Sequence, residues 1–425
     1  MMKVIIEKLV YGGKGLGRLD DKVCFVPYVL PSEEVEVRIT KEKKSFMECE
    51  PVEVLKPSPD RVEPPCRYFT YCGGCDYLHI KYQKQVEIKN HIFTETLERL
   101  GKIKEIPLRE PVPSKPDLHY RNRVQLKVKR DKIGFFKRES REVVNIDSCL
   151  LLKEELNYAL EGLREVLPFF GFAPLEVHLH SSSEGQMTAR FIFRKPLRRI
   201  PLGLKHMRAF LGEYLEGFGI YVREGAFPRR VSFVGSPFAY EVAGDYKFRV
   251  SADSFFQVNR FQVENLINMV EEIIRERQPS VVVDLYSGVG TFSIPAAKYA
   301  QKVYGVEINP YAVQDANHNR KINGVKNVTF NQSPASRVLE YTKKKNPELI
   351  IVDPPRGGLD EETIRAISSI ENLKTIVYIS CNPSTLARDI SILGEKGFEL
   401  QSTGIIDMFP HTYHIESLTL LEKLR

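Results

Sequence analysis

The fold is decided by the stretch Val281-Val282-Val283-Asp284-Leu285-Tyr286-Ser287-Gly288-Val289-Gly290-Thr291-Phe292. A short β-branched run ends in a glycine-containing turn, which is typical of a buried strand whose backbone approaches a ligand closely. Further strand-like runs follow at residues 303–307, 328–330, 349–352 and 376–380, with spacings that suit helical crossovers. This alternation predicts a parallel, doubly wound α/β sheet. The closing runs, 400–408 and 418–424, are too close for an intervening helix, which predicts an antiparallel last strand.

The acidic residues around this turn indicate which cofactor binds there. Glu307 ends the second strand, where a carboxylate can accept hydrogen bonds from both ribose hydroxyls of a nucleoside. The G-x-G-x-x-G pattern is absent, and Asp284 precedes the glycines. A pyrophosphate would be repelled there, whereas an adenosine carrying a cationic amino acid would not. The pattern therefore favours S-adenosylmethionine (SAM) over NAD, with an ordinary turn and a solvated Glu307 as the alternative.

Two later strand ends carry further candidates for chemistry. Consecutive prolines after Asp353 lock an extended turn and hold that carboxylate at the ligand-binding edge of the sheet. Cys381 follows the next strand and precedes a helix that we expect Ser384 to cap. A thiol near a helix N-terminus has a favoured thiolate and hence nucleophilic character. The alternatives are a rigid connection after Asp353 and a buried core cysteine at position 381.

A polar cluster lies between the last two strands. It contains His411, His414 and Glu416. No cysteine or third histidine completes a metal site there, so an acid–base role for Glu416 is the better interpretation. A polar hairpin without catalytic duty is the alternative.

The remaining cysteine pattern indicates a metal centre. Cys66, Cys72 and Cys75 have the spacing C-x5-C-x2-C, and Cys149 follows much later. Three clustered thiols with a distant fourth form a four-thiolate site, and the spacing alone does not choose between zinc and an iron–sulfur cluster. The N-terminus lacks a signal peptide, so we expect the protein in the reducing cytoplasm, where disulfides are rare.

The rest of the chain shows a modular organisation. Residues 1–57 alternate apolar and polar positions with frequent glycine, which predicts a small β-barrel, and a proline-rich linker follows. Apolar residues at helical spacing predict one helix through Val86, Phe93, Leu97 and Leu100 and a second over 263–274. Residues 251–259 could wall a cofactor pocket or simply form core and a helix cap.

Composition permits a polyanionic partner and argues against a membrane-spanning helix. Lys+Arg total 62 against 55 Asp+Glu, a net charge of +7, which allows a polyanionic partner without requiring one. Basic runs at 127–141 and 194–199, the second including Arg198 and Arg199, could track phosphates or remain solvated loops. No apolar run approaches the length of a membrane span.

The motifs together resemble the RNA (uracil-5-)-methyltransferase family, and within it the iron–sulfur-containing ribosomal RNA branch. The resemblance rests on motifs occurring in the family's order: Ser254-Phe255-Phe256-Gln257-Val258-Asn259, Asp284 to Phe292, Asp353-Pro354-Pro355-Arg356, Ser380-Cys381-Asn382-Pro383 and His411 to Glu416. It implies an N-terminal OB-like TRAM barrel (1–57), a central α+β domain with the cysteine site (58–250) and a SAM-dependent catalytic domain (251–425).

The resemblance also implies a role for each candidate residue. Cys381 is the expected nucleophile and Glu416 the base; Gln257, Tyr286, Glu307 and Asp353 are the expected SAM contacts; and Cys66, Cys72, Cys75 and Cys149 are the expected ligands of a [4Fe–4S] cluster. Residues 333–336 stand where an acidic residue is expected beside adenine, so no contact is assigned there.

We expect the substrate to be a uridine in RNA, and the RNA to be 23S ribosomal RNA. We expect the enzyme to be a monomer. Transfer RNA remains an alternative substrate, because some cluster-bearing relatives act on it. A non-catalytic RNA-binding or chaperone protein is the alternative from another class, and the presence of both Cys381 and Glu416 argues against it. A cytosine-5 methyltransferase would arrange its nucleophile motifs differently.

Overall fold

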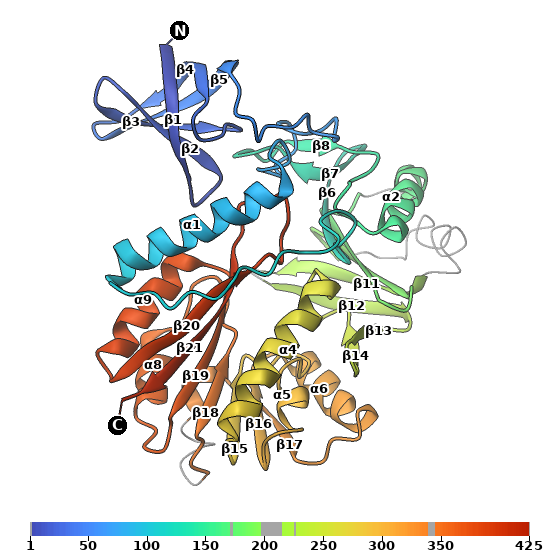
Figure 1. Cartoon of the computed structure of the whole chain (residues 1–425). Helices are drawn as coiled ribbons and strands as arrows, with labels where there is room; N and C mark the ends of the chain where they lie inside the picture. The colour runs from blue at the N-terminus through green and yellow to red at the C-terminus, as the bar shows by residue number, and fades with distance from the viewer. Residues whose placement is uncertain (1, 171–172, 197–214, 225–226, 339–344, 425) are drawn as a thin grey trace.

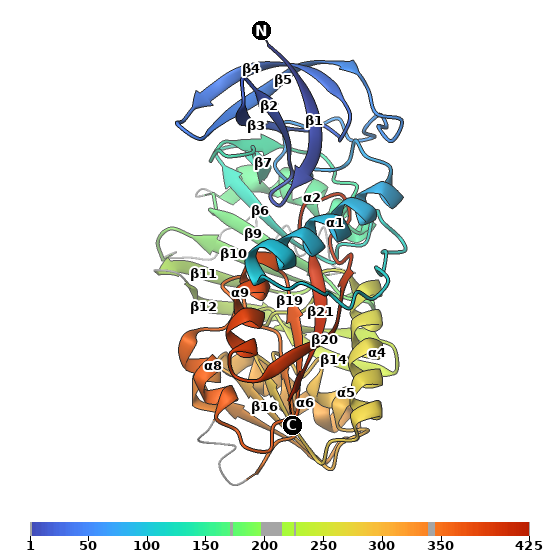
Figure 2. The same ribbon diagram turned by 60° about the vertical axis from the view of Figure 1, so that its left-hand side comes forward.

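The computed structural model describes residues 2–170, 173–196, 215–224, 227–338 and 345–424. A barrel formed by the N-terminal strands lies at one end of the molecule and the C-terminal sheet at the other, with a second large sheet between them (Figures 1 and 2). No helix in these ranges is long and apolar enough to cross a membrane.

The N-terminal strands close into a barrel in the order β1-β2-β3-β5-β4. The predicted alternation is present, because Val4, Ile6, Val35 and Val37 point into a buried core. Cys24 and Cys49 are both buried in the barrel core. The strands are β1 (Met2–Val10), β2 (Lys14–Leu19), β3 (Lys22–Pro27), β4 (Glu34–Glu42) and β5 (Phe46–Lys56).

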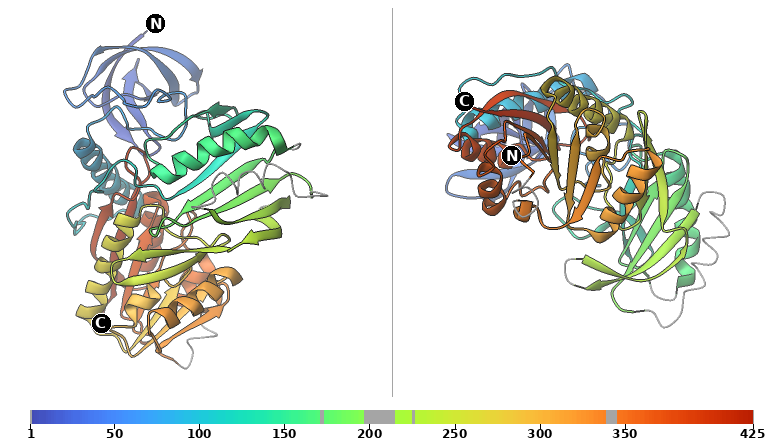
Figure 3. Two further views of the ribbon diagram at one scale, coloured as in Figure 1. Left: turned by 90° about the vertical axis from the view of Figure 1, so that its right-hand side faces the viewer. Right: turned by 90° about the horizontal axis from the view of Figure 1, so that it is seen from below.

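The middle of the chain forms a seven-stranded sheet in the order β12-β11-β10-β9-β6-β7-β8. Helix α2 (Glu154–Val166) lies across one face and buries Leu156, Leu160 and Leu163 against it (Figure 3). A short 3-10 helix, Leu167–Phe170, continues α2. Of the predicted basic residues, Arg198 and Arg199 lie outside the described ranges. The strands are β6 (Arg123–Lys129), β7 (Lys132–Phe136), β8 (Val143–Asn145), β9 (Glu176–Ser181), β10 (Met187–Phe193), β11 (Leu215–Glu224) and β12 (Phe227–Gly235).

The C-terminal sheet has the order β17-β16-β15-β18-β19-β21-β20. Strands β15 to β19 pair in parallel, whereas β21 runs antiparallel to both β19 and β20, as the sequence predicted. The central strands β15, β18 and β19 are nearly continuous apolar runs because both faces of the sheet are covered there. The seven strands are β15 (Val281–Leu285), β16 (Lys302–Glu307), β17 (Val328–Gln332), β18 (Leu349–Val352), β19 (Thr375–Ser380), β20 (Phe398–Ile406) and β21 (Glu416–Lys423).

Helices cover both faces of this sheet (Figure 3). One face packs against α4 (Arg260–Arg277), α5 (Ser293–Ala296) and α6 (Pro310–Ile322), and the other against α1 (Tyr82–Gly101), α8 (Glu361–Ser368) and α9 (Pro383–Gly394). A 3-10 turn (Ala335–Arg337) precedes α8, and a hairpin of β13 (Phe238–Ala243) and β14 (Tyr246–Ser251) packs on α6. The apolar stripe predicted for 263–274 is the buried face of α4.

Helix α1 differs from its prediction in the exposure of one residue and in the part of the molecule against which it packs. Val86, Phe93 and Leu97 are buried, but Leu100 is 57% exposed because it lies in the last turn, beyond the packed face. Although α1 falls within the range 58–250, it packs against α9 of the C-terminal sheet. A fully buried ion pair joins Lys89 of α1 to Asp407, just after β20, with an Nζ–Oδ1 distance of 2.7 Å.

Candidate active site

The predicted site residues come together at one edge of the C-terminal sheet. Glu307 ends β16, Asp353 follows β18 and Cys381 follows β19. Because β21 is antiparallel, its first residue, Glu416, lies at the same edge. Ser380, the last residue of β19, pairs with Ser417 of β21. Cys381 and Glu416 are therefore the next residues of the two neighbouring segments beyond that pair, at the same end.

The loops that carry Asp353 and Cys381 are held together by hydrogen bonds. Asn382 Nδ2 donates to the carbonyl oxygen of Arg356 at 3.1 Å, and Thr385 Oγ1 donates to the same oxygen at 3.4 Å. The cap of α9 is Asn382, whose side chain accepts from the Ser384 N–H at 3.0 Å. The predicted Ser384 cap is therefore wrong, since the chain enters the helix two residues earlier at the Asn-Pro pair.

Glu416 is buried without a full set of hydrogen bonds. It is 2% exposed, and its Oε1 has no hydrogen-bond partner among the described residues. Burial, and then the nearby carboxylate of Asp353, raise the pKa of Glu416 well above its usual range, while Arg356 opposes the shift. A buried carboxyl with a raised pKa holds a proton more tightly than an exposed one, which suits an acid–base group.

The thiol of Cys381 is not poised as a thiolate. Burial, followed by Glu416 and Asp353, raises its pKa to about 12, and Arg356 lowers it only in part. The position ahead of a helix therefore does not give the favoured thiolate that the sequence predicts, because burial and two nearby carboxyl groups favour the neutral thiol.

The cofactor candidates form two groups along the same edge. Glu307 accepts from the Gly288 N–H at 3.0 Å and the Asn309 N–H at 2.7 Å, so its carboxylate is fixed beside the glycine turn. Gln257 Nε2 donates to Asp353 Oδ2 at 3.4 Å, and burial raises the pKa of Asp353 to about 7. These contacts hold two carboxylates ready for hydrogen-bond donors from a ligand.

The turn after β15 has unusual backbone geometry. Tyr286 has φ = 61° and Gly288 has φ = 54°, and a left-handed Tyr is a costly conformation that persists only where its surroundings fix it. The Tyr286 side chain is half-buried against the core beneath α8. Such strain in a turn beside two carboxylates is typical of a ligand-binding loop.

Residues 251–259 include both structural residues and one residue that reaches the site. Phe256 is buried in the core and Asn259 caps α4, whereas Phe255 is 62% exposed and Gln257 reaches Asp353. The core and cap interpretation therefore applies to part of the stretch, and only Gln257 joins the other site residues.

One residue of this site, Arg356, was quoted in a motif but given no role from sequence. It influences both Cys381 and Glu416, and its guanidinium donates to His414 Nε2 at 3.3 Å. Asp284, which the sequence analysis used to choose between cofactors, is fully buried, and burial raises its pKa to about 7. Only the fold shows which charges these two residues face.

The two histidines of the final loop do not partner Cys381. His411 Nδ1 lies 3.0 Å from Gln85 Nε2 of α1, and His411 Nε2 lies 3.3 Å from Asp117. His414 stacks near Tyr413 with ring centroids 4.3 Å apart. The loop is thus a packed structural element, and among the described residues no group of three or more His, Cys, Asp or Glu side chains is placed to hold a single metal ion.

The four predicted cysteine ligands surround one cavity of about 340 Å³. Burial raises the pKa of Cys72 to about 12 and that of Cys75 well above its usual range, and the other thiols add to both shifts. Gly73 is needed here because a Cβ would lie 2.8 Å from the Phe136 carbonyl oxygen. Asn157 of α2 accepts from the Cys149 N–H at 2.8 Å and so fixes the fourth cysteine.

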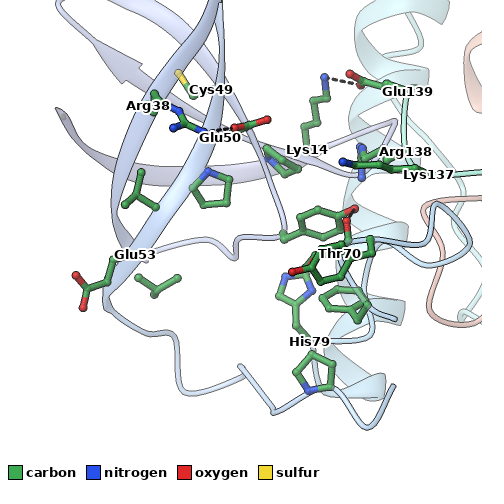
Figure 4. A pocket seen from close by; sticks show the side chains of 18 of the residues that line it. Lys14, Arg38, Cys49, Glu50, Glu53, Thr70, His79, Lys137, Arg138 and Glu139 are labelled. Carbon is green, nitrogen blue, oxygen red and sulfur yellow. Dashed lines mark hydrogen bonds and ion pairs between the residues drawn. The ribbon is translucent and has the colours of Figure 1, made fainter. Parts of the chain in front are cut away.

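A larger cavity of about 1070 Å³ lies between the barrel and the cysteine segment (Figure 4). Its walls combine aromatic side chains with charged pairs such as Arg38–Glu50 at 2.8 Å and Lys14–Glu139 at 3.0 Å. Two residues of the basic run 127–141 are also paired, because Lys127 lies 3.0 Å from Glu176 and Arg138 lies 2.8 Å from Asp76.

Comparison with known proteins identifies the family. A family model described as tRNA (Uracil-5-)-methyltransferase matches residues 81–424. The chain belongs to this family. A TRAM domain model matches residues 1–52, in agreement with the predicted barrel. The stretch between the two matches, residues 53–80, contains Cys66, Cys72 and Cys75.

Full-length relatives agree with this assignment. An uncharacterized RNA methyltransferase of Aquifex aeolicus is 39% identical over 427 residues, covering 99% of this chain and 98% of that protein. One of Caldanaerobacter subterraneus is 35% identical over 450 residues, covering 99% and 98%. The crystal structure of Pyrococcus abyssi tRNA (uracil-54, C5)-methyltransferase in complex with S-adenosyl-L-homocysteine matches with a TM-score of 0.77 and 26% identity over 99% of this chain and 100% of that one. The predicted enzyme class, an RNA (uracil-5-)-methyltransferase, is confirmed.

Proposed function

We propose that this protein methylates carbon 5 of a specific uridine in RNA, with SAM as the methyl donor, Cys381 as the nucleophile and Glu416 as the base. The observation that carries the proposal is the pairing of a thiol and an under-bonded buried carboxyl at one sheet edge, on adjacent strands. Nucleophilic and acid–base groups are needed together because carbon 5 of uracil is itself a weak nucleophile.

The reaction requires each group in turn. Addition of the Cys381 thiolate forms a sulfur–carbon 6 bond and converts the ring into an enolate, which makes carbon 5 nucleophilic. Carbon 5 then takes the methyl group from the sulfonium of SAM, whose cleaved bond leaves S-adenosylhomocysteine. Glu416 removes the remaining proton from carbon 5, and elimination breaks the sulfur–carbon 6 bond to release Cys381.

We propose that SAM binds at the turn after β15, between the carboxylates of Glu307 and Asp353. Glu307 would accept hydrogen bonds from the ribose, beside the strained turn of Tyr286 and Gly288. Gln257 and Asp353 would contact the donor nearer to Cys381. The crystal structure of the Pyrococcus abyssi relative contains S-adenosyl-L-homocysteine, which supports a donor of this class.

We propose a [4Fe–4S] cluster as the group held by Cys66, Cys72, Cys75 and Cys149. Four partly buried cysteines around one cavity of about 340 Å³ fit a multi-atom cluster better than a single zinc ion bound at about 2.3 Å. Iron would also stabilise thiolates that burial otherwise disfavours. Brown protein with stoichiometric iron and sulfide supports the proposal, whereas colourless protein with stoichiometric zinc contradicts it.

We propose large ribosomal RNA as the substrate, because the barrel and the four-cysteine site accompany that branch in the resemblance. The cavity between the barrel and the cysteine segment would receive RNA, with aromatic side chains for stacking and basic groups exchanging ion pairs for phosphates. Transfer RNA is the second candidate, because the full-length structural match is to an enzyme of that substrate class.

Methyl transfer tests both candidates at once. Labelled SAM is incubated with total RNA lacking 5-methyluridine, and the RNA is separated by size, with Cys381→Ala as the control. Label in large ribosomal RNA that the variant does not produce supports the proposal. Label in transfer RNA keeps the mechanism and changes the substrate. No label in either fraction, despite SAM binding, contradicts the proposed activity.

A further inference from the structure

The first turn of the N-terminal barrel reaches the catalytic loop, residues 407–415 between β20 and Glu416. Tyr11 follows β1, and its ring meets that of Tyr413 edge-on, with centroids 5.6 Å apart and an interplanar angle of 88°. Tyr413 lies against His414, whose ring is 5.6 Å from that of Phe409. A row of aromatic rings therefore runs from the barrel into the loop that precedes Glu416.

A network of hydrogen bonds fixes the barrel turn in this position. Arg138 donates to the Gly12 carbonyl oxygen at 3.1 Å and to Asp76 Oδ1 at 2.8 Å. The other oxygen of Asp76 accepts from the Tyr413 N–H at 3.3 Å. Gly13 has φ = +82° and packs so closely that a Cβ would lie 3.0 Å from the Asp76 Cβ. One Arg–Asp pair thus joins the barrel, the cysteine segment and the catalytic loop.

Tyr11 lies close enough to feel the charges of the reacting groups. Burial raises its pKa to about 12, and the neighbouring Tyr413, Cys381 and Glu416 contribute, while Arg356 opposes them. The phenol is therefore neutral at physiological pH and cannot serve as a base. Its half-buried ring is available for contact with an apolar, planar group.

We propose that Tyr11 is an RNA-binding residue of the active site, stacking with Tyr413 against the base next to the flipped target uridine. The inference rests on the proposed function, and it makes the barrel part of the active site. The partner is the adjacent base because the chemistry needs both faces of the target ring, one for Cys381 and one for the methyl donor. Single-stranded bases that are splayed apart commonly stack on tyrosine rings.

The test compares a ring-preserving with a ring-removing substitution. Tyr11→Leu should lower the methylation rate at subsaturating RNA by about 10- to 100-fold, the range expected for losing one stacking contact. Tyr11→Phe should restore the wild-type rate, because stacking does not need the hydroxyl. SAM affinity should stay unchanged in both variants, and the assay is run well below the melting temperature of each. Phe25→Leu, which alters another barrel ring that contacts Phe46, is the matched control and should leave the rate unchanged.

A second measurement uses the unaltered protein. Large ribosomal RNA and transfer RNA transcripts containing 4-thiouridine are irradiated in complex with the enzyme, and cross-linked peptides are mapped. Cross-links at Tyr11 or Tyr413 support the inference. Their absence from both residues, or a wild-type rate in Tyr11→Leu, overturns it. If the wild-type enzyme methylates neither RNA and leaves no cross-link at either tyrosine, the proposed function and the inference fail together. If the wild-type enzyme methylates RNA and Tyr11→Leu does so at the same rate, only the inference is overturned.

Discussion

Two sets of buried carboxyl groups in the catalytic half of this enzyme have opposite surroundings. Asp315 and Asp389 are fully buried and well supplied with hydrogen bonds: Asp315 accepts from Arg249, Ser251 and Ser254, and Asp389 from Leu359, Tyr378 and Arg388. Asp284 and Glu416 are equally buried, yet each has one oxygen without a partner among the described residues.

The difference separates structural from chemical carboxyl groups. A buried carboxylate that accepts several hydrogen bonds keeps its charge and fixes the backbone around it. Burial without such compensation raises the pKa, as it does for Asp284, Asp353 and Glu416. All of these raised groups lie at the carboxyl edge of the C-terminal sheet, so incomplete bonding marks the site itself.

The largest expected effect comes from removing the nucleophile. Cys381→Ala should lower methyl transfer by roughly 10⁴-fold or more, because without sulfur addition carbon 5 has no enolate to react through. SAM binding should persist, and this is measured by calorimetry beside the labelled-methyl assay. Cys24→Ala, which removes a buried barrel thiol instead, should retain activity. Normal turnover by Cys381→Ala would show that the thiol at this edge is structural.

Glu416→Gln should give the next largest effect and a distinctive product. The amide keeps the shape but cannot take the carbon 5 proton, so turnover should fall by about 10²–10⁴-fold while a covalent protein–RNA species accumulates. Denaturing gel electrophoresis with labelled RNA detects that species. Asp389→Asn is the matched change among the well-bonded carboxyl groups, and it should destabilise the fold without trapping RNA. A Glu416→Gln variant that releases product normally would assign the base elsewhere.

Periodicity predicted the parts of the fold that depend on local sequence. The stripe from Val263 to Ile274 is the buried face of α4, and the runs of the C-terminal sheet, including the antiparallel strand β21, are where the sequence placed them. These features follow from one element burying one face, which the order of apolar residues specifies directly.

Contacts between distant segments were not predictable in the same way. The thiolate expected at Cys381 depended on a helix N-terminus next to it in sequence, but its pKa is dominated by burial and by Glu416, 35 positions later. Similarly, no local pattern shows that Tyr11 meets Tyr413. Such pairs are set by how separate elements pack, and a single sequence carries no direct signal of that packing.

The buried ion pair between α1 and the catalytic loop tests whether buried carboxyl groups with full sets of partners stabilise the fold. Lys89→Met should lower the free energy of unfolding by about 3–5 kcal/mol, because Asp407 would be left as a buried charge without its cation. Urea denaturation measures the change. Lys84→Met, on an exposed position of the same helix, should have little effect. Adding Asp407→Asn to Lys89→Met should recover part of the loss; an additive loss would mean that the two side chains do not interact.

The most gradual expected effect concerns the under-bonded Asp284, and its size depends on pH. Its carboxyl has a pKa of about 7 in the folded protein against 3.8 ordinarily, so the folded state holds the proton more tightly. The associated stability is present below pH 4 and is lost as pH rises toward 7, by at most about 1.4 kcal/mol per pH unit. Asp284→Asn cannot titrate, so relative to wild type it should become progressively more stable between pH 5 and pH 8 in urea denaturation without SAM. The Asp389→Asn variant should instead be less stable than wild type at every pH from 5 to 8, because it loses hydrogen bonds that the Asp389 side chain accepts. Parallel pH profiles for the two variants would remove the distinction between the two classes of carboxyl group.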